Sequence, residues 1–114
     1  MKKVEATIQP FMLDAVRDAL VAAGIEGMSM SEVKGLDPHA HSAWYRGSEY
    51  VVWFGPRIKI EIVVADIDVN RCIAAIERNA RTAAGENGEI VVVPVDEAIT
   101  IRTGERMARV ARAA

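Results

Sequence analysis

One pattern occurs twice in this chain: an alternation of apolar and polar residues, then apolar residues at helical spacing, then a second short strand-like stretch. In the first repeat these stretches are residues 3–8, 13–23 and 28–33, and in the second they are residues 57–65, 69–80 and 90–95. Alternation of period two is typical of a half-buried strand, and apolar residues three and four apart are typical of an amphipathic helix. The order therefore predicts two strand–helix–strand units.

Two such units packed together predict an α+β fold of the ferredoxin-like, split βαβ kind, in which an antiparallel sheet carries both helices on one face. The length of 114 residues fits one domain, residues 1–114. The other face of the sheet would stay open, and a lone chain of this size buries only about two-thirds of its unfolded surface. We therefore expect a homo-oligomer.

Composition excludes several classes of protein. The formal net charge is −2, so the basic surplus usual in a nucleic-acid binder is absent. No apolar run approaches the ~18 residues of a membrane span, and the first residues do not form the uncharged stretch of a signal peptide. We expect a cytoplasmic protein without direct membrane insertion. The one cysteine, Cys72, excludes an internal disulfide framework and is predicted to be an inert thiol packed in the second helix.

Between the two units the pattern changes. Residues 35–47 lack periodicity and are predicted to form an irregular loop, and residues 49–54 and 57–65 are predicted to be strands broken at Gly55-Pro56. A loop between two strands in this way forms a projecting hairpin, and we call residues 35–55 the arm. Loops of this length in so small a domain tend to be functional.

The second unit carries its own boundary signals. Asp66 or Asp68 is expected to cap the second helix, which we expect to end at residues 83–85. Asn87-Gly88 predicts a turn before the last long strand. A short strand is expected at residues 98–101, and the Ala- and Arg-rich tail at residues 105–114 could form a helix.

No catalytic motif is present: the chain has neither a GxSxG sequence nor a phosphate-binding loop ending in Gly-Lys-Ser/Thr. The acidic residues are scattered along the chain. Glu32 and Glu61 lie on predicted strands, where a solvent-exposed position explains a carboxylate without a catalytic role. We expect no catalytic residues.

The arm carries the candidate binding residues. Two histidines two apart in an extended segment, His39 and His41, point the same way and with Asp37 could share a divalent metal, although a solvated loop explains them as well. Trp44 and Tyr45 could anchor a partner or pack on the body. In the tail, Arg106, Arg109 and Arg112 recur every three residues, with Arg102 just upstream, which fits a solvated face or an anion or partner contact.

Residues 45–50 read Tyr-Arg-Gly-Ser-Glu-Tyr, which resembles the signature of the PII nitrogen-regulatory signal-transduction proteins. The resemblance extends over nearly the whole chain, at matching spacing. It includes the opening Met-Lys-Lys-Val-Glu-Ala, the first helix at residues 13–20, Lys-Ile-Glu-Ile-Val-Val at residues 59–64, and Ile-Arg-Thr-Gly-Glu at residues 101–105.

This resemblance implies a trimer of ferredoxin-like subunits with adenine nucleotides bound between them. It also implies 2-oxoglutarate binding, with magnesium and triphosphate, at the base of the arm, which that family calls the T-loop. The T-loop would then dock on a membrane transporter or a metabolic enzyme, and Trp44, Tyr45, Arg46 and Tyr50 are the expected contacts. Tyr50 matches the family's uridylylated tyrosine, and Ser48 matches a serine that is phosphorylated in some members. The positions expected to bind nucleotide or 2-oxoglutarate are Ser29, Gly35, Arg57, Val63, Gly88 and Arg102.

The departures from the family pattern concentrate at the ligands. Ala84 and Glu89 replace phosphate-binding lysines, and Thr100 replaces an arginine. Two unit charges 4 Å apart interact by about 4 kcal/mol near a protein surface, so the lysine-to-glutamate change alone would weaken binding by at least about tenfold. We expect weak or absent ATP binding, with ADP or AMP less affected. The glutamine that binds 2-oxoglutarate is missing near residues 37–41, so that sensing is expected to be lost. The alternative is a metal-responsive relative linked to metal efflux through the arm histidines.

Overall fold

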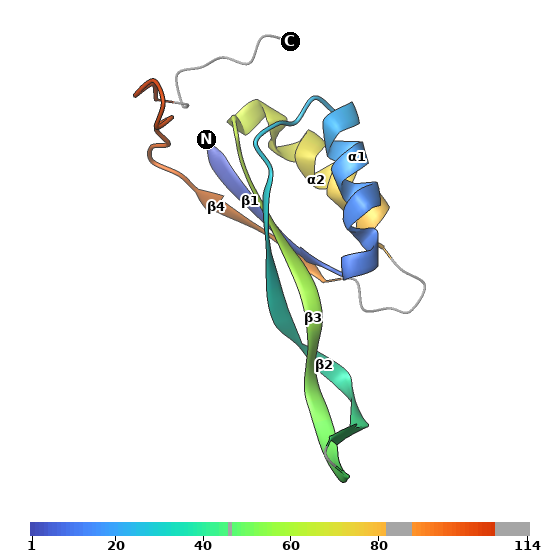
Figure 1. The fold of residues 1–114 in the computed structure, drawn as a ribbon. Coiled ribbons are helices and arrows are strands. Elements are labelled where there is room, and N and C mark those ends of the chain that lie inside the picture. Colours follow the sequence, from blue (N-terminus) through green and yellow to red (C-terminus); the bar gives the residue numbers. More distant parts are fainter. Residues whose placement is uncertain (46, 82–87, 107–114) are drawn as a thin grey trace.

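The computed structural model describes residues 1–45, 47–81 and 88–106, and within its strands it gives only the backbone of residues 37–45, 50, 52 and 53. Strands and helices follow one another along the chain as two βαβ units (Figure 1). The elements are β1 (Lys2–Ile8), a 3-10 turn (Pro10–Met12), α1 (Leu13–Ala22), β2 (Ser29–Tyr45), β3 (Ser48–Val64), a 3-10 turn (Asp66–Asp68), α2 (Val69–Ala80) and β4 (Glu89–Pro94).

The four strands form one sheet in the order β2-β3-β1-β4, and every neighbouring pair is antiparallel. Both helices lie against the same face of this sheet (Figure 1). The arrangement confirms the predicted α+β fold with a ferredoxin-like topology. Because β2 and β4 are the outer strands, each leaves one edge without a partner within the described chain.

The core lies between the sheet and the helices. Alternate residues of β1 and β3 point into it, as their period of two predicts, and the apolar stripes of α1 and α2 cover them. The largest fully buried side chains are Ile8, Leu20, Ile60, Ile62, Ile76, Val4, Val16 and Cys72. Burial raises the pKa of the Cys72 thiol to about 11. Cys72 is therefore an inert packed thiol, as expected.

The prediction of an irregular loop at residues 35–47 was wrong, because β2 continues through this stretch to Tyr45. Strands β2 and β3 are each 17 residues long and pair beyond the body as a two-stranded ribbon (Figure 1). Solvent reaches both faces of such a ribbon, so its residues need not alternate in polarity. Backbone pairing along the ribbon therefore leaves no signature in the sequence.

The predicted break at Gly55-Pro56 was also wrong, because β3 runs through it without interruption. The last pair that joins β3 to β1 is Ile8↔Ile58, so Pro56 lies where β3 has only β2 beside it. A proline is tolerated at such an open edge, because its missing N–H removes no ladder bond on the unpartnered side.

The expected cap of α2 was wrong as well: neither carboxylate makes a side-chain cap hydrogen bond. Asp66 instead pairs with the N-terminal ammonium at 2.6 Å, which lowers the pKa of its carboxyl, and Asp68 accepts a hydrogen bond from Arg71 at 2.5 Å. Both carboxylates therefore have ionic partners, and Asp68 stands at the N-cap position of α2 without a side-chain cap hydrogen bond.

Other predicted boundaries also changed. Helix α2 ends at Ala80, before the expected residues 83–85, and the expected strand at 98–101 is reduced to an isolated bridge, Ile99↔Arg106. The tail predicted as a helix lies, beyond Arg106, outside the described residues, as do Arg109, Arg112 and Asn87.

Candidate functional site

The arm is a β-hairpin whose strands pair as far as Tyr45↔Ser48. Ser48 is exposed at the start of β3, and Gly47 beside it has φ +77°, which suits the tight reversal. Tyr50 lies opposite Ala43 in the backbone ladder. The two candidate modification residues therefore lie at the end of the ribbon farthest from the body (Figure 1).

The ladder of the arm is broken at one place. The register passes from Leu36↔Phe54 to His41↔Val52, so residues 37–40 on β2 face the single residue 53 on β3. Extra residues on one strand bend the ribbon and re-aim its side chains, and such bulges are frequent beside functional sites. The candidate metal ligands Asp37 and His39 fall inside the bulge, and His41 follows it.

Most side chains assigned to the arm lie outside the described residues. This applies to Asp37, His39, His41, Trp44, Tyr45 and Tyr50, and to Arg46 as a whole. No group of three or more His, Cys, Asp or Glu side chains that could hold a metal occurs in the part of the chain that is described. The metal and partner assignments on the arm therefore stay predictions.

At the base of the arm the structure brings together Gly35, Gly55 and Arg57. The two glycines are cross-strand partners, and the Arg57 side chain covers them. A Cβ on Gly35 would lie 2.9 Å from Cγ of Arg57, and one on Gly55 would lie 3.1 Å from its Nη1. The same Nη1 donates a hydrogen bond to the carbonyl of Pro56 at 2.8 Å. The absence of two side chains thus allows the half-buried arginine to lie flat on the ribbon.

The remaining candidate nucleotide residues are spread over the sheet. Ser29 begins β2, where its hydroxyl contacts the Glu61 carbonyl at 3.5 Å, and Gly35 follows about 20 Å along the same edge strand. Val63 is half-buried on β3, whereas Gly88 directly precedes β4 at the opposite edge. One chain therefore does not gather this set into a single cleft.

Gly88 is in close contact with strand β1. Its φ is +83°, and a Cβ there would lie 1.7 Å from the Thr7 carbonyl oxygen. The next residue, Glu89, pairs with Thr7 as the first step of the β1–β4 ladder and is exposed. Glycine at position 88 therefore allows β4 to start against β1, and Glu89 places a carboxylate at that point.

Arg102 belongs to a compact turn after β4. The Thr100 amide donates to the Glu105 carbonyl at 2.9 Å, and the Gly104 amide donates to the Thr100 carbonyl at 2.7 Å. An ion pair between Arg106 and Glu97 closes the base of the turn. Arg102 itself is exposed, so its guanidinium is accessible to an anion or to another chain.

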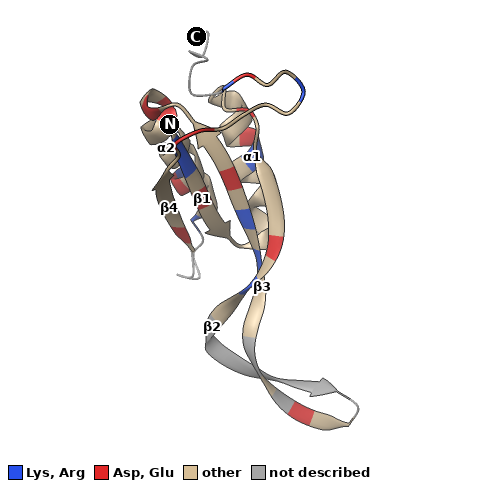
Figure 2. Ribbon diagram, turned by 90° about the vertical axis from the view of Figure 1, so that its left-hand side faces the viewer, with Lys and Arg blue, Asp and Glu red and all other residues tan. Residues whose placement is uncertain are grey.

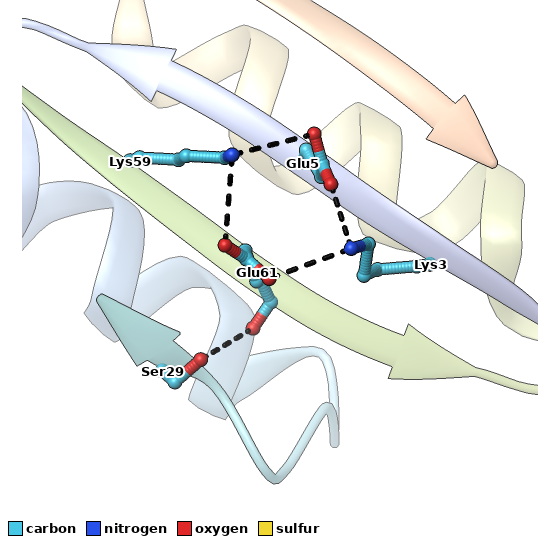
Figure 3. Close-up of polar contacts among 5 residues, drawn as sticks. All are labelled: Lys3, Glu5, Ser29, Lys59 and Glu61. Atoms are coloured by element: carbon cyan, nitrogen blue, oxygen red, sulfur yellow. Dashed lines mark hydrogen bonds and ion pairs between the residues drawn. The ribbon is translucent and has the colours of Figure 1, made fainter. Parts of the chain in front are cut away.

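A group of four charged residues that the sequence pattern did not predict lies on the face of the sheet away from the helices (Figure 3). Lys3 contacts Glu5 at 2.8 Å and Glu61 at 3.6 Å, and Lys59 contacts each of these carboxylates at 3.7 Å. We call Lys3, Glu5, Lys59 and Glu61 the charge ring. The hydrogen bond with Lys3 lowers the pKa of Glu5, and the same bond raises the pKa of Lys3.

The charge ring is neutral overall, and both signs of charge are also interspersed over the rest of the body (Figure 2). Its residues occupy the polar positions of β1 and β3, so the alternating pattern places them on one face. Only the register Glu5↔Glu61 reveals that they interact across the strands. In the described part of the chain, no helix has the length and apolar character needed to cross a membrane.

Comparisons with known proteins agree with this geometry. Residues 1–105 match the family described as "Nitrogen regulatory protein P-II". The chain is 50% identical over 106 residues to the Nitrogen regulatory protein P-II of Cereibacter sphaeroides, covering 92% of this chain and 95% of the relative. It is 49% identical over 107 residues to that of Azospirillum brasilense, covering 93% and 96%. It is 50% identical over 106 residues to Nitrogen regulatory protein P-II 1 of Escherichia coli K12, covering 92% and 95%.

Proposed function

The chain belongs to the nitrogen regulatory protein P-II family, and from this we propose that it acts as a homotrimeric sensor whose arm is the T-loop. Members of this family are signal-transduction regulators, and this chain is such a regulator and not an enzyme. We further propose that the candidate nucleotide cleft lies between two subunits and that its affinity for triphosphate is weakened. The arm would dock on a transporter or a metabolic enzyme.

The placement of the candidate nucleotide residues supports a cleft between subunits. Ser29 and Gly35 lie on one outer strand of the sheet, and Gly88 begins the other outer strand. Two copies that place β2 of one beside β4 of the next would bring these positions together. The open face has a neutral charge ring, and Val91 beside it on β4 is 42% exposed, so this surface suits burial against another copy.

We propose weak triphosphate binding mainly because of Glu89. Its carboxylate lies next to Gly88, at the position where the family has a phosphate-binding lysine, and it makes no ion pair with the described residues. A carboxylate near a triphosphate repels it, and the expected losses of cations at Ala84 and Thr100 add to this effect. Arg102 remains as an exposed cation, which supports retention of ADP or AMP.

The test is isothermal titration with ATP, ADP and AMP, each with and without magnesium and 2-oxoglutarate. We expect weak or absent ATP binding, no ATP-dependent binding of 2-oxoglutarate, and at least about tenfold stronger ATP binding by Glu89→Lys. Glu26→Lys is the matched control, because Glu26 is also exposed but lies in the turn before β2. Tight ATP binding by the native chain, or equal affinities for the two lysine variants, would refute the proposal.

Contact with a target is assigned to Trp44, Tyr45, Arg46 and Tyr50. Of these, Trp44, Tyr45 and Tyr50 belong to the backbone ladder at the far end of the ribbon, which projects from the body and so can enter a concave surface on a partner (Figure 1). Tyr50 and Ser48 are the proposed modification sites. Loss of partner capture in a Trp44→Ala variant, with the trimer intact, is the expected result, and undiminished capture would remove this assignment.

A second candidate function is metal sensing by Asp37, His39 and His41. The observation that favours it is the bulge at residues 37–40, which falls on this stretch. Titration with Zn²⁺ or Cu²⁺ would show binding that is lost in a His39→Ala/His41→Ala double variant. Equal metal affinity of the native chain and the double variant would exclude the site.

A further inference from the structure

A cavity of about 340 Å³ lies on the helix side of the sheet, between the end of α2 and the paired ends of β1 and β4. Its volume is in the range of small-molecule sites. The floor is apolar: Ile8, Ile76 and Ala80 are at most 5% exposed and line it together with Ile90.

One wall of the cavity is fixed in position. Gly88 and Thr7 both line it, and these are the residues whose backbones approach too closely to admit a Cβ. The ladder pair Thr7↔Glu89 holds the start of β4 at the same place. A cavity bounded by paired backbone keeps its shape when empty, so a ligand entering it loses little free energy to reorganisation of the protein.

The opposite wall carries two opposite charges. Glu77 and Arg81 lie one helical turn apart at the end of α2, both line the cavity, and their side chains form an ion pair. The side chains are 50% and 69% exposed, so both can accept a further partner from solvent. Helix α2 ends at Ala80, and the negative end of its dipole therefore also faces this region.

We propose that this cavity binds an α-amino acid with an aliphatic side chain. The ammonium would pair with Glu77 and the helix end, the carboxylate would form paired hydrogen bonds with Arg81, and the side chain would lie on the isoleucine floor. A zwitterion matches both charges at once. A simple anion would lack the ammonium that pairs with Glu77 and the helix end, and a simple cation would lack the carboxylate that pairs with Arg81.

The cavity shares Gly88 and Glu89 with the proposed nucleotide cleft, but the two charged residues that would hold the amino acid, Glu77 and Arg81, are not among the residues of that cleft. A trimer that binds no nucleotide could therefore still bind an amino acid here, and the two proposals can fail separately. Binding of an amino acid in this cavity would give the regulator a second ligand besides nucleotide, bound at the end of α2.

The test is isothermal titration of the full chain with L-leucine, together with the amine isoamylamine and the acid 4-methylpentanoate, each of which lacks one charge. We expect L-leucine to bind, and both analogues to bind at least about tenfold more weakly, because each loses a charge-assisted contact. Methyl NMR shifts caused by leucine should concentrate at Ile8, Ile76 and Ile90.

Glu77→Gln and Arg81→Gln should each weaken leucine binding by about tenfold or more without unfolding the chain, since both side chains are exposed. Arg78→Gln is the matched control: it removes a charge from the same helix turn, and Arg78 does not line the cavity. The proposal is overturned if leucine does not bind, if either analogue binds as well as leucine, or if Arg78→Gln weakens binding as much as Arg81→Gln.

Discussion

Replacing Gly88 by alanine tests how β4 is joined to the rest of the sheet. The left-handed backbone at φ +83° costs an alanine about 1–2 kcal/mol. The new Cβ would also lie 1.7 Å from the Thr7 carbonyl oxygen, so the start of β4 must move and lose about 1 kcal/mol of ladder hydrogen bonding. Alanine also restricts the unfolded chain more than glycine does, and this offsets about 0.5 kcal/mol of the loss of stability. The net loss of stability is about 1.5–2.5 kcal/mol.

Gly104→Ala is the matched control. Its φ is +73°, but a Cβ there would meet nothing within 4 Å, so only the backbone cost of about 1 kcal/mol applies. Thermal and urea unfolding at one fixed protein concentration measure both variants, because the midpoint of an oligomer depends on concentration. Gly88→Ala should lower Tm by about 10 °C or more, roughly twice the effect of Gly104→Ala. Equal losses would refute the close approach of Gly88 to β1.

Three further predictions follow from burial and charge. The Cys72 thiol, with its pKa raised to about 11, should resist a thiol reagent at neutral pH in the folded protein and react fully in denaturant; fast reaction of the folded chain would contradict its burial. Ile76→Ala should cost about 2–5 kcal/mol in urea unfolding, and a loss below 1 kcal/mol would show a poorly packed core. The pKa of Glu5 is lowered in the folded chain, so its contribution to stability is present above the unfolded pKa and lost as pH falls through the folded one. Glu5→Gln should therefore lower Tm at neutral pH and matter less below about pH 4, and an equal effect at both pH values would contradict the charge ring.

The body of the fold was predictable because its residues alternate between core and solvent. Val4 and Ile60 point under the helices while Glu5 and Glu61 point away, and that alternation is legible in the sequence. The arm was not predictable in the same way. Its backbone pairs with itself in solvent, so the bulge at residues 37–40 and the unbroken passage through Pro56 depend on register, which local composition does not encode.

The candidate site also has features that could be predicted from the sequence and features that could not. Residues 45–50 and the departures at Ala84 and Glu89 were visible in the sequence, because they are matters of residue identity. The position of the Arg57 side chain over Gly35 was not visible in the sequence, because it requires two strands to lie side by side with a defined pairing.

By itself, the sequence determined the order of strands and helices, the residues of the core and the family, since period, composition and motif are properties of the chain read along its length. Only the tertiary structure decided which charges meet in the ring, where Gly88 approaches Thr7, and that Glu77 and Arg81 flank an apolar cavity. These features join residues that are distant in the chain or separated by a helical turn. Their contacts depend on strand register and on where each helix ends, and both are set by packing of the whole domain.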